Sequence, residues 1–108
     1  MLARIVILVF LFCSGAGLTG AEERGDRATG LSYAKQACAT CHAIRQGDSI
    51  SPDPLAPSFD AIANSAGASV ISLATVLRSV HENMPNFVLS PNEEDNVIAY
   101  ILSLKKER

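Results

Sequence analysis

The sequence predicts a single all-α domain of three to five helices, and three observations support this prediction. No stretch of its 108 residues shows the strict polar–apolar alternation of a half-buried strand. Apolar residues instead recur three and four positions apart, which is the spacing of one helix face. One segment also carries a complete helix start, in which Ser90 is followed by Pro91 and Glu93.

The first helix is expected from residue 30 or 31 to about residue 41. Leu31, Ala34 and Cys38 recur there at helical spacing, with alanines among the residues between them. Residues 43–57 contain Gly47, serines and three prolines, a composition typical of a loop. We therefore expect a long irregular segment after the first helix.

Two further helices are expected before the last one. A short helix runs from residue 59 to about residue 65 and is ended by Gly67. A longer helix runs from about residue 69 to residue 82. Pro85 follows it, because proline disfavours helical geometry at the residue before it. The apolar stripe of this helix consists of Val70, Leu73, Leu77 and Val80.

The last helix is expected to begin at Pro91, with Ser90 as its N-cap. Acidic residues in its first turn, and Lys105 and Lys106 at its end, complement the helix macrodipole. Its buried side consists of Val97, Ile98, Ile101, Leu102 and Leu104.

The first 21 residues are interpreted as a secretory signal peptide. Arg4 gives a weakly positive start, residues 5–12 form an unbroken apolar run, and small residues lead to a cleavage site after Ala21. The run is far shorter than the roughly 20 residues that span a bilayer, so no stable membrane insertion is expected. Residues 22–29 then form a polar leader and residues 30–108 the folded domain. We therefore expect a periplasmic protein.

Cys13 leaves one alternative open. A lipoprotein signal places the modified cysteine at the cleavage site, after small residues, but here Leu11 and Phe12 precede it. Lipid anchoring at Cys13 is therefore the less favoured interpretation.

The charge of the chain argues against a nucleic-acid partner. The chain has 9 basic and 11 acidic residues, and loss of Arg4 with the signal takes the formal net charge from −2 to −3. No basic patch is interleaved with aromatic residues. An acidic surface instead favours neutral or basic protein partners.

The decisive segment for function is Cys38-Ala39-Thr40-Cys41-His42. Two cysteines three positions apart, followed directly by a histidine, have the spacing of covalent haem attachment. On one helical turn the two sulfurs can bond neighbouring vinyl groups of one porphyrin, and the imidazole can reach its metal. The segment predicts one covalently bound haem c, with His42 as a ligand to the iron.

Three other interpretations fit this segment less well. A thioredoxin-like pair of cysteines expects a βαβ context, and no strand is visible. A structural zinc site needs four ligands, whereas the mature chain beyond this cluster offers His81 and carboxylates but no second pair of cysteines. A disulfide between Cys38 and Cys41 leaves His42 unexplained.

Over about residues 30–104 the chain resembles a class I cytochrome c. The resemblance implies the cytochrome c fold, with helices wrapped around one haem, and the transfer of single electrons. It rests on four features in family order: Gly30 and Tyr33 before the Cys38–His42 segment, Ala56-Pro57-Ser58-Phe59, Met84-Pro85-Asn86-Phe87, and Tyr100-Ile101-Leu102-Ser103-Leu104.

The resemblance makes Met84 the second axial ligand of the iron. A soft, neutral thioether favours ferrous iron and raises the reduction potential. Met84 is also the only methionine that remains once the signal is removed. His81 is the alternative ligand, but it lies within the predicted helix, whereas Met84 lies where the backbone leaves that helix.

The resemblance also suggests roles for five other residues. Pro57 resembles the proline whose carbonyl accepts a hydrogen bond from the haem-binding histidine and so orients its ring, although an ordinary loop proline is equally compatible. Gly30 and Tyr100 resemble the close contact between the first and last helices. Phe59 and Phe87 are expected to pack in the haem pocket.

The resemblance implies an electron carrier rather than an enzyme, since both axial positions of the iron are filled and the sequence offers no separate catalytic dyad. Its partners are expected to be redox protein donors and acceptors that meet it through a small, transient interface. Two alternatives remain open. One is a haem subunit bound tightly to a periplasmic dehydrogenase, and the other is a ligand sensor or peroxidase that acts after Met84 dissociates.

Overall fold

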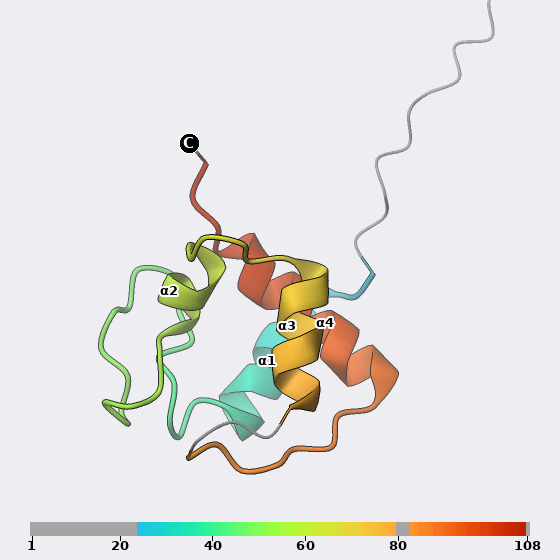
Figure 1. The fold of residues 1–108 in the computed structure, drawn as a ribbon, viewed down its shortest axis with the longest axis horizontal. Coiled ribbons are helices and arrows are strands. Elements are labelled where there is room, and N and C mark those ends of the chain that lie inside the picture. Colours follow the sequence, from blue (N-terminus) through green and yellow to red (C-terminus); the bar gives the residue numbers. More distant parts are fainter. Residues whose placement is uncertain (1–23, 80–82, 108) are drawn as a thin grey trace, which may run out of the picture.

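The computed structural model describes residues 24–79 and 83–107. Within these residues the chain forms four helices and no strand (Figure 1), so the predicted all-α class is confirmed. The helices are α1 (Arg27–Ala37), α2 (Phe59–Ala63), α3 (Val70–Arg78) and α4 (Pro91–Ser103). The predicted signal peptide with Cys13, the first two residues of the leader, Val80 and the alternative ligand His81 lie outside the described residues.

Helix α1 begins and ends earlier than expected. The Asp26 side chain accepts a hydrogen bond from the Thr29 amide at 2.6 Å, so this N-cap starts the helix at Arg27, within the segment expected as a polar leader. At the other end the amides of Cys38 and Ala39 both donate to the carbonyl of Ala34, each at 2.9 Å. This closes the last turn, so Cys41 and His42 lie in the turn after the helix.

The first and last helices cross at a very close approach (Figure 1), which confirms the contact predicted for Gly30 and Tyr100. A Cβ atom at Gly30 would lie 2.0 Å from the carbonyl oxygen of Asn96 and 2.9 Å from the Cβ of Tyr100. No side chain fits in that space, so only glycine allows α1 to rest on the backbone of α4.

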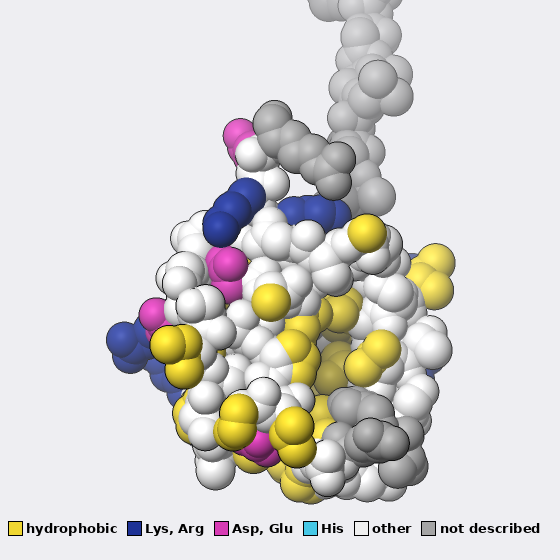
Figure 2. Space-filling model, turned by 60° about the vertical axis from the view of Figure 1, so that its left-hand side comes forward, with side chains coloured by type: hydrophobic (Ala, Val, Ile, Leu, Met, Phe, Trp, Pro, Cys, Tyr) yellow, Lys and Arg dark blue, Asp and Glu magenta, His cyan; other side chains and the backbone are white. Residues whose placement is uncertain are grey.

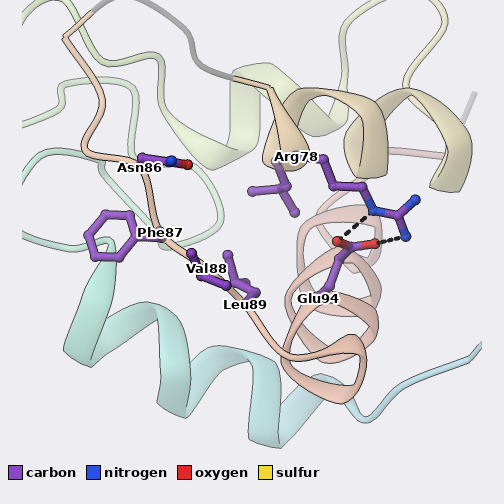
Figure 3. A pocket seen from close by; sticks show the side chains of 7 residues that line it. Arg78, Asn86, Phe87, Val88, Leu89 and Glu94 are labelled. Carbon is purple, nitrogen blue, oxygen red and sulfur yellow. Dashed lines mark hydrogen bonds and ion pairs between the residues drawn. The ribbon is translucent and has the colours of Figure 1, made fainter.

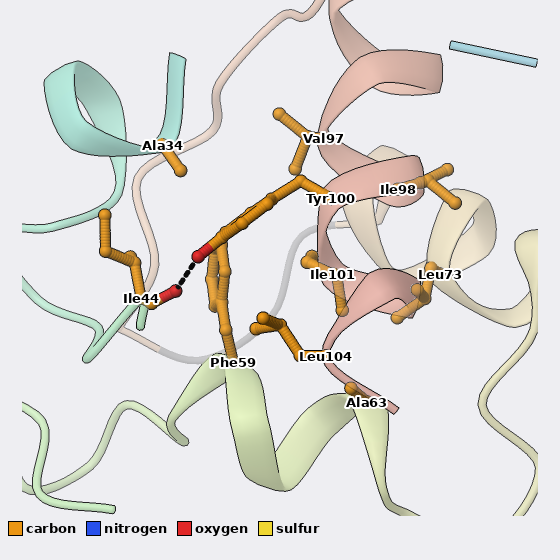
Figure 4. Close-up of a cluster of buried hydrophobic side chains, with 10 residues drawn as sticks. All are labelled: Ala34, Ile44, Phe59, Ala63, Leu73, Val97, Ile98, Tyr100, Ile101 and Leu104. Atoms are coloured by element: carbon orange, nitrogen blue, oxygen red, sulfur yellow. Dashed lines mark hydrogen bonds between the residues drawn. The ribbon is translucent and has the colours of Figure 1, made fainter. Parts of the chain in front are cut away.

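Helix α4 starts as predicted and supplies four of the ten residues of the core cluster. The Ser90 hydroxyl accepts from the Glu93 amide at 3.3 Å, and the Glu93 carboxylate accepts from the Ser90 amide at 2.8 Å. Its inner face packs against the other three helices, although Leu102, expected on this face, is only half-buried. The core cluster (Figure 4) consists of Ala34, Ile44, Phe59, Ala63, Leu73, Val97, Ile98, Tyr100, Ile101 and Leu104.

Helix α2 is shorter than expected because Asn64 ends it. The Asn64 side-chain amide donates to the carbonyl of Asp60 at 2.8 Å, just after the last helical residue. Gly67, expected to end this helix, instead turns the chain before α3 with a φ of +80°.

Helix α3 also ends before its expected limit at residue 82. Its last residue is Arg78, and Ser79 has extended backbone angles, with ψ at 147°. In its predicted apolar stripe Leu73 is buried and Leu77 half-buried, whereas Val70 is 51% exposed. No helix among the described residues is long and apolar enough to cross a membrane.

Candidate cofactor site at the Cys38–His42 turn

The turn after α1 brings two thiols and one imidazole together. The amides of Cys41 and His42 both donate to the carbonyl of Cys38, at 3.2 and 2.9 Å, so the three residues share one tight turn. Cys38 and Cys41 are free thiols, and both are half-buried. The alternative of a disulfide between them is therefore not formed, and each sulfur is available to bond a ligand.

The Cys38 thiol is anchored to the protein core. It packs against the buried cluster, and this burial raises the pKa of the thiol above its ordinary value. The thiol therefore stays protonated at neutral pH and packs as a small apolar group.

The ring of His42 is held by the carbonyl of Pro57. Nδ1 of His42 lies 2.6 Å from the Pro57 oxygen. A carbonyl oxygen only accepts hydrogen bonds, so Nδ1 carries a proton, and Nε2 is the ring nitrogen that can offer a lone pair to a ligand. A neutral imidazole with a free Nε2 and a fixed ring is the form that binds a metal ion. The structure thus brings Pro57 to His42.

The backbone around His42 is fixed by residues far along the chain. The Ala43 carbonyl accepts from the Phe59 amide at 2.8 Å, and the Cys41 carbonyl accepts from the Asp53 amide at 3.1 Å. The Phe59 ring is buried, with its centroid 5.5 Å from that of the His42 ring. Phe59 therefore packs directly beside the candidate ligand.

Met84 lies in a separate segment, between α3 and α4. It is half-buried, and the described residues around it, 83–89, contain no helix or strand. Phe87, expected in the haem pocket, is 37% exposed and lines a depression of about 200 Å³ between this segment and the ends of α3 and α4 (Figure 3). None of Cys38, Cys41, His42, Pro57 or Met84 lines this depression.

The chemistry of these donors fits a covalently bound haem. Two free thiols three residues apart can form two thioethers, and the imidazole beside them offers one nitrogen to iron. Large apolar side chains are also exposed on the described surface and could be covered by a bound group: Ile50, Leu55, Ile71 and Val88 are 73–91% exposed. Figure 2 shows one face of the molecule hollowed, with hydrophobic side chains in the hollow.

Two further contacts are not predicted by the sequence analysis. The Tyr100 hydroxyl donates to the carbonyl of Ile44 at 2.5 Å (Figure 4), and Arg78 forms an ion pair with Glu94. Glu94 is buried, and a sequence signal for this exists. It lies three and seven positions before Val97 and Ile101, on the same helix face. Helical spacing alone could therefore have marked Glu94 as a carboxylate in need of a partner.

Two comparisons with known proteins found similar chains. A family model described as "Cytochrome C oxidase, cbb3-type, subunit III" matches residues 25–101. Cytochrome c-552 of Bradyrhizobium diazoefficiens is 33% identical over 102 residues, which cover 94% of each chain. No solved structure matches significantly.

Proposed function

The chain belongs to the c-type cytochromes, which carry electrons, and from that premise we propose that it shuttles single electrons between redox proteins. In this proposal one haem is bound covalently at Cys38 and Cys41, and His42 and Met84 are the ligands of its iron. The bound haem supplies the reversible change between ferric and ferrous iron. The observation that carries the proposal is the His42–Pro57 hydrogen bond in the turn that also carries both thiols.

Each residue of the proposed haem site has a distinct role. Cys38 and Cys41 would hold the haem through two thioether bonds, since addition of each S–H group to one vinyl group needs no oxidant. His42 binds the iron through Nε2. Pro57 holds the imidazole in one tautomer and one orientation, which tunes its strength as a ligand.

Met84 is proposed as the second ligand for chemical reasons. Its thioether is neutral and soft, so it stabilises ferrous iron and raises the reduction potential. If His42 and Met84 both hold the iron, the iron would have no free position for a substrate. We therefore propose that the protein is a carrier and not an enzyme.

The proposed location is the periplasm. It rests on residues 1–21 as a signal peptide, and lipid anchoring at Cys13 is the less favoured alternative. The proposed partners are redox protein donors and acceptors that meet this acidic domain through a transient interface, without nucleic acid or stable membrane insertion.

A second candidate function is a haem subunit bound stably to a larger redox enzyme. The description of the matching family favours this candidate, since it names a subunit of an oxidase. A periplasmic dehydrogenase is the other enzyme considered. A ligand sensor or peroxidase is a further alternative, and it requires Met84 to leave the iron.

The test is a reductive titration of the exported, purified protein. We expect one electron per chain, the weak far-red absorption of a methionine bound to ferric iron, and a single small species in gel filtration. Co-elution with a larger catalytic subunit would support the second candidate instead. Tight binding of carbon monoxide by the untreated reduced protein at neutral pH would support a ligand sensor. A chain that takes up no electron would contradict all three.

A further inference from the structure

Helices α3 and α4 are joined by the ion pair of Arg78 and Glu94, here called the clamp. Nε of Arg78 donates to Oε2 of Glu94 at 3.0 Å, and Nη2 donates to Oε1 at 2.6 Å (Figure 3). Two parallel hydrogen bonds of this kind fix both the distance between the two side chains and their relative orientation.

The two side chains of the clamp differ in their burial. The Glu94 side chain is 9% exposed and that of Arg78 is 72% exposed. A buried carboxylate without its cation is strongly unfavourable, so Glu94 requires Arg78 in place. The hydrogen bonds that the Arg78 guanidinium donates to Glu94 raise the pKa of Arg78 above its ordinary value, so this side of the clamp keeps its charge.

The clamp encloses the segment that carries Met84. Arg78 is the last residue of α3, and Glu94 lies in the first turn of α4, so the ion pair joins the two ends of the loop of residues 79–90. A loop whose ends are held together explores fewer conformations than one whose ends are free. The clamp residues also line the depression whose far side is formed by Asn86, Phe87, Val88 and Leu89, directly after Met84 (Figure 3).

We propose that the clamp of Arg78 and Glu94 positions Met84 for binding to the iron. This inference rests on the proposed haem site. Holding the end of α3 against α4 keeps the thioether near the metal, so the fraction of molecules in which Met84 has left the iron stays small. Arg78 and Glu94 are thus positioning residues for the exchangeable ligand.

A second ion pair of the same helix provides a matched control. Lys106 follows α4, and its Nζ lies 3.6 Å from Oδ2 of Asp60 in α2. This pair joins α4 to α2 at the end of α4 that is far along the chain from Met84. It tests whether loss of any ion pair to α4 has the same effect.

The experiment measures how readily imidazole displaces Met84 from the ferric holoprotein. An added ligand binds more tightly in proportion to the fraction of molecules whose binding position is free. We expect R78Q and E94Q to bind imidazole about tenfold more tightly than the parent, because a tenfold larger fraction has lost the Met84 bond. The control D60N should stay within about twofold of the parent, because the pair of Lys106 and Asp60 lies at the end of α4 that is far along the chain from Met84.

Two more variants test whether the pair acts as a unit. The double variant R78Q/E94Q should resemble each single variant rather than their product, because the two side chains serve one interaction. R78K keeps the charge but loses the two-pronged geometry, so its imidazole affinity should lie between those of the parent and R78Q. R78K also keeps the test decisive if R78Q does not fold.

Amide hydrogen exchange of residues 84–89 gives a second readout on the same proteins. Exchange should speed up in R78Q and E94Q and stay at the parental rate in D60N. If R78Q, E94Q and R78K bind imidazole no more tightly than D60N does, the clamp has no part in positioning Met84.

The failure of the proposed ligand set has a different signature. A parent protein without the far-red band, or an M84A variant whose imidazole affinity equals that of the parent, would remove Met84 as a ligand. That result overturns the ligand set and this inference together, whatever the clamp variants do.

Discussion

The two segments that carry the proposed iron ligands are built in opposite ways. His42 lies in residues 41–44, which are bonded to distant parts of the chain, including Pro57, Phe59 and Tyr100. Met84 lies in residues 83–89, where Val88 is 91% exposed and the Phe87 amide bonds locally to the carbonyl of Pro85 at 2.9 Å. The backbone on either side of the first proposed ligand is therefore tied to the core, whereas the second proposed ligand is carried on a surface segment.

This difference predicts which of the two proposed iron ligands, His42 or Met84, can be displaced more readily. Each buried hydrogen bond that holds the His42 side contributes roughly 1 kcal/mol, and several must break before His42 can move. The position of Met84, by contrast, depends on the contacts at the two ends of the loop that carries it. We expect His42 to stay on the iron under conditions in which Met84 exchanges, and the following predictions test that asymmetry.

The largest effect is expected for Met84→Ala. The variant should keep its haem but lose the far-red band, and its reduction potential should fall by on the order of 0.1 V or more, because the ligand that favours ferrous iron is gone. Redox titration and the ferric spectrum measure both changes. Val88→Ala, a change at an exposed residue of the same segment, is the control and should leave both unchanged. An unaltered band in Met84→Ala would assign the second ligand to another residue.

Gly30→Ala should cause the next largest effect, now on the stability of the core. The added Cβ would lie 2.0 Å from the Asn96 oxygen, so α1 and α4 must separate. We expect a loss of about 2 kcal/mol in the free energy of unfolding, measured by urea titration. Gly67→Ala is the comparison, since a Cβ there meets nothing within 4 Å and only its φ of +80° is strained. Gly67→Ala should lower the free energy of unfolding by about 1 kcal/mol. Equal losses in the two glycine variants would contradict the close contact between α1 and α4.

Tyr100→Phe should have a smaller effect, confined to the His42 side. It removes the hydroxyl that donates to the Ile44 carbonyl and leaves that carbonyl unpaired, at a cost of about 1 kcal/mol in unfolding experiments. Burial raises the pKa of Tyr100 above its ordinary value, so the hydroxyl is protonated at neutral pH.

The pH dependence of the Tyr100 contribution follows from that shift. A group whose pKa is raised in the folded protein stabilises it fully below the unfolded pKa of about 10, and this stabilisation is lost as the pH rises through the folded pKa. Tyr33→Phe, at a half-buried residue, is the control. At neutral pH it should lower the free energy of unfolding by less than Tyr100→Phe does. Equal costs for the two variants would argue against the Ile44 hydrogen bond.

The smallest predicted effect is at Asp26 and appears only in acid. Hydrogen bonding from the Thr29 amide lowers the pKa of this carboxyl, so its contribution is present above the ordinary pKa near 4 and is lost as the pH falls below it. Asp26→Asn keeps a capping oxygen but does not titrate. Its unfolding free energy should therefore fall less than that of the parent between pH 7 and pH 3. A parallel fall in both proteins would rule out Asp26 as a titrating cap.

Local sequence signals predicted the parts of the fold that depend on neighbours in the chain. The start of α4 at Ser90 needs only Pro91 and Glu93, which are adjacent in sequence, and the structure agrees. The contact of Gly30 with Tyr100 was predicted through the family resemblance, which carries tertiary information that spacing alone does not.

Errors arose where contacts between distant residues decide the outcome. Helical propensity extends α3 to residue 82, but the helix ends at Arg78, whose side chain is committed to Glu94 on α4. The start of α1 is different, because Asp26 and Thr29 form a local cap. That signal was present in the sequence and was outweighed by the polar composition of residues 22–29.

The site was predictable to a similar degree. The spacing of Cys38, Cys41 and His42 marks the turn from sequence alone, and the structure adds the hydrogen bond from His42 to Pro57. The ion pair of the clamp could not be predicted from the sequence, because nothing near Glu94 in the chain indicates that its partner is Arg78. Met84 remains a proposed ligand.

The most direct test of the account is acid–acetone extraction of the exported protein, followed by the intact mass of the polypeptide. The account predicts that the colour stays with the protein and that its mass exceeds that of the processed chain by one haem. The double variant Cys38→Ser/Cys41→Ser should release all of its pigment to the solvent. Parent protein that is colourless, or that loses its pigment on extraction, would contradict covalent attachment and with it the proposed carrier of electrons.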